Sequence, residues 1–223
     1  MGLRFDFLAD TYGMFLEGAG TTILLALVTV IFGVLLGLLI ALMRLSKIKI
    51  LKWIAIGYTE LIRGTPLMVQ IVIIYYGIIP NISGLGNIIE FASGCLALSI
   101  NSSAYVAEII RSGIQSVDPG QMEAARSLGM KQSLAMKSII IPQAIKNILP
   151  ALGNEFVVVI KESAIVYLIG NVNDLMYQAK TIAGAKFLPI EPYLVAALLY
   201  FIMTFTISKL LGLAEGRLRK SER

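Results

Sequence analysis

Long apolar runs alternate with short polar segments along this chain, and the alternation predicts a bundle of membrane helices. The clearest run covers residues 21–43, which carry no charge and are long enough to cross a hydrocarbon core of about 30 Å. Counting along the chain gives five transmembrane helices in all, in one domain over residues 1–223. The predicted fold class is therefore an all-α membrane protein, with spans at 21–43, 53–79, 88–113, 148–170 and 193–213.

The second predicted span is interrupted by residues that weaken a helix. Residues 67–79 alone are too few to cross a membrane at about 1.5 Å per residue, so this helix must begin near Trp53. Residues 64–66, which read Gly-Thr-Pro, should loosen it within the span, because proline removes a backbone hydrogen bond. We therefore expect one long helix with a weak point, followed by a short outside turn at residues 80–84.

The first twenty residues do not look like a cleavable signal, because they carry Asp6, Asp10 and Glu17. Apolar and aromatic side chains recur there at spacings of three and four. This pattern predicts a short helix lying along the membrane surface, with a frayed terminus as the alternative.

Basic residues are distributed unevenly between the apolar runs. Most of them lie in residues 44–52, in residues 126–146 and in the tail from Arg217 onward. The connection over 171–192 carries only Lys180 and Lys186. Because loops rich in Lys and Arg stay on the cytoplasmic side, the sequence predicts an outside N-terminus and a cytoplasmic C-terminus.

Composition narrows the chemistry. Of the 223 residues, 57% are hydrophobic and 15% charged, so the net charge of +5 is explained by membrane orientation rather than by nucleic-acid binding. The absence of histidine excludes His-based acid–base catalysis and most zinc or haem sites. A single cysteine, Cys95, can form no intrachain disulfide, and no phosphate-binding loop of the GxxxxGK[ST] type is present. We therefore expect no metal, cofactor or ATP site on this chain.

Several polar residues fall near the middle of predicted spans. Such residues are costly in a bilayer, and they mark either a transport pathway or contacts between helices. Adjacent helical residues point about 100° apart, so Lys161 and Glu162 cannot pair along one face. Lys161 could meet a substrate carboxylate, whereas Glu155 or Glu162 could favour a cationic side chain. The pathway candidates are Gln70, Asn101, Ser102, Glu155, Lys161, Glu162 and Ser163.

An acid followed three residues later by an arginine occurs twice near the inner boundary. These pairs are Glu60 with Arg63 and Glu108 with Arg111. Residues at this spacing are neighbours on a helix and can neutralise each other. Two interpretations stay open: each pair anchors its helix at the interface, or the two helices exchange partners at an inner gate.

Residues 118–142 form the only long polar segment between apolar runs. Asp118 is a good helix cap ahead of Pro119, and Gly129 is suited to the left-handed turn that ends a helix. A second helix is predicted to start at Ser133 and end near Pro142. The segment thus predicts a helix, a turn and a helix on the cytoplasmic side.

The spacing within this segment resembles the EAA loop of ABC importer permeases. Residues 123–125 read Glu-Ala-Ala, Gly129 follows after three residues, and Ile139-x-Ile141-Pro142 follows after nine, with Ile141 in place of leucine. Residues 63–67 with Gln70, residues 104–114 and residues 161–163 narrow the resemblance to the polar amino acid permease family.

This resemblance implies a type I ABC importer permease fold and a non-catalytic subunit in a bacterial plasma (inner) membrane. It also implies partners: a second permease chain, an ATPase dimer that binds ATP and Mg, and an external binding protein that delivers an L-amino acid. The ATPase would dock on a coupling helix formed by Glu123, Ala124, Ala125, Arg126, Leu128 and Gly129.

Two other classes of function were weighed. A passive channel or pore would use the mid-membrane polar residues equally well, but it leaves the segment at 118–142 unexplained. An intramembrane enzyme is disfavoured, because the sequence has no histidine, no paired intramembrane aspartates and no metal-ligand cluster. The sequence does not name the amino acid carried.

Overall fold

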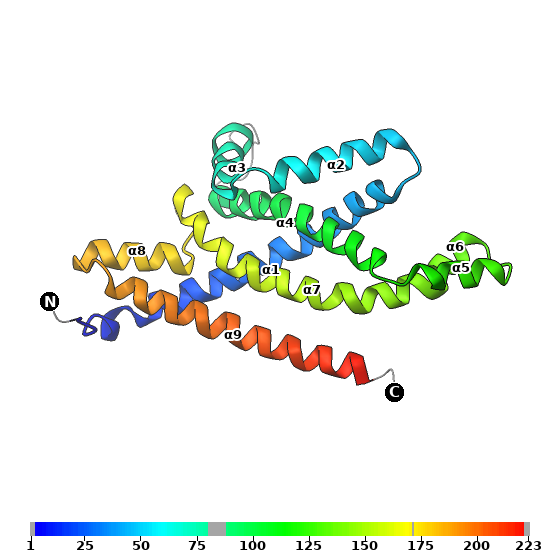
Figure 1. Cartoon of the computed structure of the whole chain (residues 1–223). Helices are drawn as coiled ribbons and strands as arrows, with labels where there is room; N and C mark the ends of the chain where they lie inside the picture. Colours follow the sequence, from blue (N-terminus) through cyan, green and yellow to red (C-terminus); the bar gives the residue numbers. More distant parts are fainter. Residues whose placement is uncertain (1–2, 80–87, 171, 221–223) are drawn as a thin grey trace.

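The computed structural model describes residues 3–79, 88–170 and 172–220, and all regular elements within these ranges are helical. Helices α1 (Leu8–Leu45) and α4 (Ile89–Gln115) cross at the centre of the molecule, and α7 (Ile141–Glu162) packs against both. The N-terminus lies at one end of the bundle (Figure 1), and the C-terminus lies toward the other.

The remaining elements surround this centre. Helix α8 (Leu175–Lys186) packs near the N-terminal end, while α5 (Pro119–Ser127) and α6 (Gln132–Ala135) project from the opposite end (Figure 1). Helix α9 (Glu191–Lys220) packs against α7 and α8. The polar connection over residues 171–192 thus contains the helix α8.

Helix α1 is longer than the sequence indicated. The predicted surface helix near the N-terminus is wrong, because α1 runs without a break from Leu8 to Leu45. Its first turns are held by the chain itself: Phe15 is buried among residues of α8 and α9, and the Cα of Leu175 lies against Gly18. These turns are therefore part of the bundle, while Tyr12 and Leu16 of α1 stay exposed.

Small residues let α1 and α4 approach closely. A Cβ atom added to Gly37 would lie 2.6 Å from Cγ1 of Val106, and one added to Gly33 would lie 3.1 Å from Oγ of Ser102. Two glycines four residues apart on an apolar helix are a known motif for close helix packing in membranes. This pair of glycines was a signal available in the sequence. It explains why α1 and α4 can lie in close contact at the centre of the bundle.

The second predicted span is two helices rather than one. Helix α2 (Lys49–Arg63) is followed by α3 (Leu67–Ile73), which continues directly as the π-helix η1 (Ile74–Ile78). The axis of α2 and the axis of α3–η1 differ by a bend of 105°. The weak point predicted at residues 64–66 is confirmed, but the single helix over 53–79 is wrong. The outside turn predicted at residues 80–84 lies outside the described residues.

The helix that contains the fourth predicted span begins earlier than expected. Helix α6 continues through the π-helix η4 (Met136–Ile140) into α7, so no helix ends at Pro142 as expected. Pro142 is the second residue of α7, a position that tolerates proline. After Glu162 the chain tightens into the 3₁₀-helix η5 (Ser163–Ile169). Lys161 and Glu162 therefore lie at the end of an α-helix rather than in the middle of one.

Two described helices, α1 and α9, are long and apolar enough to cross a membrane by themselves. The count rises to three if α2 and α3–η1 form one bent span. Helices α4 and α7 are long, but their polar residues lower their hydropathy, and many of these residues are buried inside the bundle. The total of five spans stays a prediction.

Candidate functional site

Helix α5 has the caps that the sequence predicted. The Oδ1 atom of Asp118 accepts a hydrogen bond of 2.7 Å from the backbone N–H of Gly120, and Pro119 is the first helical residue. At the other end Gly129 has φ of 82°, in the left-handed region. The N–H of Gly129 donates to the carbonyl of Arg126 at 3.0 Å, and that of Met130 donates to Ala125 at 3.1 Å. This pair of bonds is the Schellman motif, so α5 is a short helix with both ends fixed.

The two faces of α5 differ. Glu123 and Ala124 are exposed and Leu128 is 85% exposed, so these residues are available to a partner. Ala125 is only 3% exposed and contacts its own chain. Arg126 donates from Nη1 to the carbonyl of Met130 at 2.7 Å and so helps to cap α5. Ala125 therefore packs on the inner face of α5, while Glu123, Ala124 and Leu128 lie on its exposed face.

Gln70 holds the bend between α2 and α3. Pro66 has no N–H to donate to the carbonyl of Ile62, four residues earlier, and the side chain of Gln70 replaces it with a hydrogen bond of 2.7 Å from Nε2. The same Nε2 lies 2.8 Å from Oγ1 of Thr65. Gln70 thus takes the place of a missing backbone donor in a buried region.

Asn101 completes this arrangement from α4. Its Nδ2 donates to Oε1 of Gln70 at 2.9 Å, and both side chains are buried. The amide oxygen and nitrogen of Gln70 are therefore both occupied within the chain. Gln70 and Asn101 link α3 to α4 through this hydrogen bond, and their predicted place in the pathway stays a prediction.

Ser102 and Glu155 form a buried contact between α4 and α7. The hydroxyl of Ser102 donates to Oε1 of Glu155 at 2.8 Å. Glu155 is 8% exposed and makes no ion pair with any described residue. A buried carboxylate usually has a cationic partner, so this group is a candidate for a ligand that brings its own positive charge.

Lys161, Glu162 and Ser163 lie where α7 passes into η5. Lys161 is exposed and Glu162 is half-buried, and neither makes an ion pair or hydrogen bond with another residue in the described ranges. Ser163 is buried, and its hydroxyl donates to the carbonyl of Ile160 at 2.8 Å. The structure therefore brings two unpaired charges to one helix end and gives Ser163 a local role. No group of three or more acidic or cysteine side chains in the described part could hold a metal ion.

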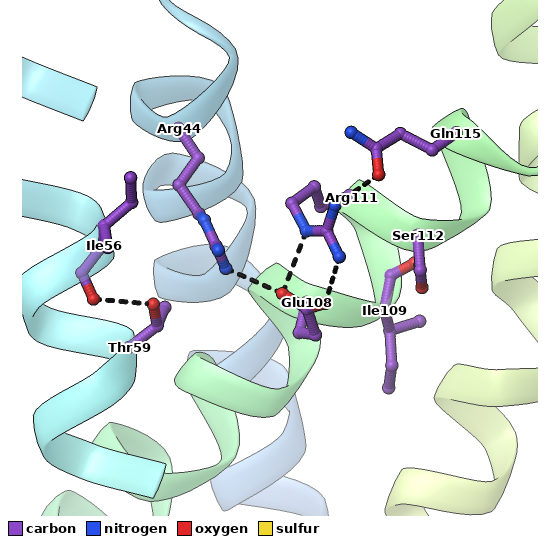
Figure 2. Close-up of polar contacts among 8 residues, drawn as sticks. All are labelled: Arg44, Ile56, Thr59, Glu108, Ile109, Arg111, Ser112 and Gln115. Atoms are coloured by element: carbon purple, nitrogen blue, oxygen red, sulfur yellow. Dashed lines mark hydrogen bonds and ion pairs between the residues drawn. The ribbon is translucent and has the colours of Figure 1, made fainter. Parts of the chain in front are cut away.

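The two predicted acid–arginine pairs have different fates. Glu108 accepts from Arg111, as expected, and also from Nη1 of Arg44 at 2.7 Å, from the end of α1 (Figure 2). Glu60 and Arg63 form no ion pair in the described structure. Arg63 instead places its guanidinium 5.5 Å from the centre of the Tyr105 ring on α4.

The sequence analysis did not connect Arg44 with Glu108. Arg44 is the first basic residue after the apolar run of α1, and Glu108 is the acid nearest the end of α4. Both therefore mark the same boundary of the bundle. This shared depth was the available signal.

The fold and these sites define a class of protein. Apolar helices surround buried and unpaired polar groups, and an exposed, capped helix projects from one end of the bundle. This arrangement is that of a transport subunit in a membrane.

The comparison with known families agrees with this class. Residues 33–220 match the family described as binding-protein-dependent transport system inner membrane component, and the chain belongs to this family. Its members are non-catalytic membrane subunits of ABC transporters, and this chain is one.

Individual relatives are similar over their whole length. The chain is 38% identical to the arginine transport system permease protein ArtQ of Bacillus subtilis (strain 168), with 100% of both chains covered. It is 39% identical to the probable glutamine ABC transporter permease protein GlnM of the same organism, covering 98% of this chain and 100% of GlnM. A solved structure described as an amino acid ABC transporter with histidines superposes with a TM-score of 0.90 at 53% identity, covering 97% of this chain and 100% of that one.

Proposed function

We propose that this chain is the permease of an ATP-driven importer for L-amino acids and that it favours those with a cationic side chain. One observation carries the second part. Glu155 and Glu162 lie seven residues apart, on one face of α7, and neither carboxylate forms an ion pair within 4.0 Å with a described residue, although the neighbouring Lys161 interacts with Glu162 electrostatically. A guanidinium, imidazolium or ammonium group would neutralise them.

The relatives support this substrate class. ArtQ is named for arginine, and the solved structure of the similar transporter is described with histidines. GlnM is named for glutamine, so a neutral polar amino acid is the competing substrate. Lys161 adjoins Glu162 and is free to meet the carboxylate that every amino acid carries.

The topology supports a multi-pass protein of the bacterial plasma membrane with an outside N-terminus and a cytoplasmic C-terminus. The two termini lie toward opposite ends of the bundle (Figure 1), which is the arrangement expected for an odd number of crossings. We propose five, with α2 and α3–η1 counted as one bent span and α4 and α7 as two more. Asn101, Ser102 and Ser103 of α4 and Glu155 of α7 are buried by neighbouring helices, which lowers the cost of placing these polar groups in a membrane.

The exposed face of α5 is the proposed contact with the partner ATPase. Both ends of this helix are capped, so its backbone is fixed, and the side chain of Leu128 is almost fully exposed. We expect this side chain to insert into an apolar groove of the ATPase. The ATPase dimer would bind ATP and Mg, an external binding protein would deliver the amino acid, and a second permease chain would complete the complex.

Uptake by the assembled complex tests the substrate. The permease is reconstituted in liposomes with its ATPase and binding protein, and uptake of labelled arginine, histidine and glutamine is compared. We expect arginine and histidine to be preferred. We expect Glu162→Gln to reduce their uptake by at least about tenfold and to affect glutamine less. Equal losses for all three amino acids would overturn the cationic preference, and uptake without ATP would favour a passive pore.

The docking of the ATPase is tested on α5 directly. Ala124→Leu enlarges an exposed residue and should weaken co-purification of the ATPase without changing thermal stability. Ala185→Leu makes the same change at an exposed position of α8, at the other end of the molecule, and serves as the control. Unchanged binding of the ATPase by the Ala124 variant would contradict the docking role.

A further inference from the structure

Polar side chains occupy one face of α4 over its second half. Asn101, Tyr105 and Glu108 follow one another at spacings of four and three residues, so they lie one above the other on the helix. Arg111 and Gln115 continue the same row. These five residues are called the polar face of α4 below.

Each of the first three residues of this face contacts a different helix. Asn101 donates to Gln70 of α3 at 2.9 Å, on one side of the bend. Tyr105 lies under Arg63 of α2, on the other side of the bend, with 5.5 Å between guanidinium carbon and ring centre.

Glu108 extends these contacts to the first helix. Its Oε2 atom accepts from Arg44 of α1 at 2.7 Å. The polar face of α4 thus holds α3, α2 and α1 in turn, and no other described helix has ion pairs or polar side-chain contacts to all three.

The polar face also reaches the start of α5. Arg111 binds Glu108 with Nε and Nη2 and Gln115 with Nη1, as Figure 2 shows. Gln115 is the last residue of α4, and α5 begins at Pro119. The helix α4 therefore carries, on one face, the contacts to the bend between α2 and α3 and the Glu108–Arg111–Gln115 cluster that ends three residues before Asp118, the cap of the helix proposed to bind the ATPase.

Glu108 is the centre of this row. Two guanidinium groups share its carboxylate, and the side chains of Arg44 and Glu108 are only 14% and 24% exposed. Hydrogen bonds between ionised groups are directional and stronger than neutral ones. Packing at Gly33 and Gly37 brings α1 and α4 together, but apolar packing alone does not fix how far one helix slides along the other.

We propose that the polar face of α4 makes α1, the α2–α3 bend and α4 move as one body when α5 is displaced, with Glu108 as the positioning residue. Glu108 touches neither ATP nor the amino acid in this role. It determines how much of the displacement of α5 reaches the helices around the pathway. This inference rests on the proposed transport function.

The test measures uptake and ATP hydrolysis in the same liposomes. Arg44→Gln and Glu108→Gln should lower the number of amino acids imported per ATP by at least about fivefold, the low end of usual coupling effects. Stimulation of hydrolysis by the binding protein should persist. Lys47→Gln removes an exposed charge three residues from Arg44 and should leave the ratio unchanged.

A charge exchange separates positioning from general damage. The double variant Arg44→Glu with Glu108→Arg keeps one carboxylate and two guanidinium groups in the cluster. We expect it to recover most of the lost import per ATP. If the Glu108 variant fails to assemble, Arg44→Gln carries the test, since it leaves Glu108 paired with Arg111.

Two results would overturn the inference. One is an unchanged ratio in both single variants, and the other is a double variant no better than either single one although the complex assembles. Failure of the proposed transport function looks different, because the unaltered protein would then import none of the tested amino acids.

Discussion

Polar residues lie at two breaks in helices, the α2–α3 bend and the α7–η5 junction, and the two breaks differ in whether these residues find hydrogen-bond partners within the chain. At the α2–α3 bend, Gln70 and Asn101 use their amide groups on each other and on the backbone freed by Pro66. At the α7–η5 junction, the side chains of Lys161 and Glu162 form no hydrogen bond or ion pair with any described residue. The same signal in the sequence, a polar residue within an apolar run, thus has opposite meanings at the two breaks.

The difference shows what distinguishes a structural polar residue from a functional one in a membrane helix. A buried polar group costs free energy unless it is hydrogen-bonded. The bend meets this cost within the chain and becomes rigid. The junction leaves charges unpaired, which is tolerable only where water, a ligand or another chain supplies the partner.

The largest expected effect is at the bend. Gln70→Leu leaves the carbonyl of Ile62 and the amide of Asn101 without partners, and we expect a loss of about 4 kcal/mol in the free energy of unfolding. Thermal unfolding in detergent measures it. Gln121→Leu, at an exposed position of α5, is the control and should change stability little. A small loss at Gln70 would remove the main contrast between the two breaks.

A buried carboxylate held by backbone groups provides an intermediate case. Asp174 is fully buried and accepts from the N–H groups of Met176 at 3.3 Å and Tyr177 at 3.2 Å, which caps α8. Burial raises the pKa of Asp174 from 3.8 to about 7, although the two hydrogen bonds oppose the change. Because the folded state keeps this proton to higher pH than the unfolded state, the contribution of Asp174 to stability is greatest below pH 4 and falls as the pH rises to about 7.

Asp174→Asn removes this titration. The stability of the variant relative to the unaltered protein should therefore rise between pH 4 and pH 8, by roughly 2–3 kcal/mol. Unfolding curves at several pH values measure the difference. A constant difference across this range would show that Asp174 does not titrate as its burial implies.

A double-mutant cycle at the bend sharpens the explanation of Gln70. Pro66→Ala restores an N–H that can bond to Ile62, so Gln70→Leu should cost about 1–2 kcal/mol less in that background. Stability measurements on the two single variants and the double variant give the interaction energy. Simple additivity would mean that Gln70 does not replace the donor that proline lacks.

The smallest effect is expected at the junction. Lys161→Gln and Glu162→Gln should each change the free energy of unfolding by less than about 0.5 kcal/mol, because neither side chain has a partner to lose. The same unfolding assay applies. A loss comparable to that of Gln70→Leu would identify the two charges as structural and would make the two breaks alike.

Local signals in the sequence predicted the helix ends well. Pro66 marked the bend, and Asp118 and Gly129 marked the ends of α5, since each acts on backbone groups within a few residues. Local signals failed where neighbouring packing overrides them. The amphipathic start of the chain became part of α1, and Pro142 did not end a helix, because α6, η4 and α7 continue through it.

The partners of the polar residues were not predictable in this way. Asn101 is 31 residues from Gln70, and Glu108 is 64 residues from Arg44. No pattern along the chain relates residues so far apart. The expected Glu60–Arg63 pair had the right spacing along the helix but does not form. The guanidinium of Arg63 lies instead over the ring of Tyr105, on another helix.

The sequence by itself determined that the chain is a helical membrane protein, where its helices are weak and where an exposed capped helix interrupts it. Hydrophobic runs, glycine, proline and capping residues act locally, so their effects can be predicted from neighbours in the chain. Only the tertiary structure decided which buried polar groups find partners and which charges stay unpaired. Those contacts depend on close packing of distant helices, made possible here by Gly33 and Gly37.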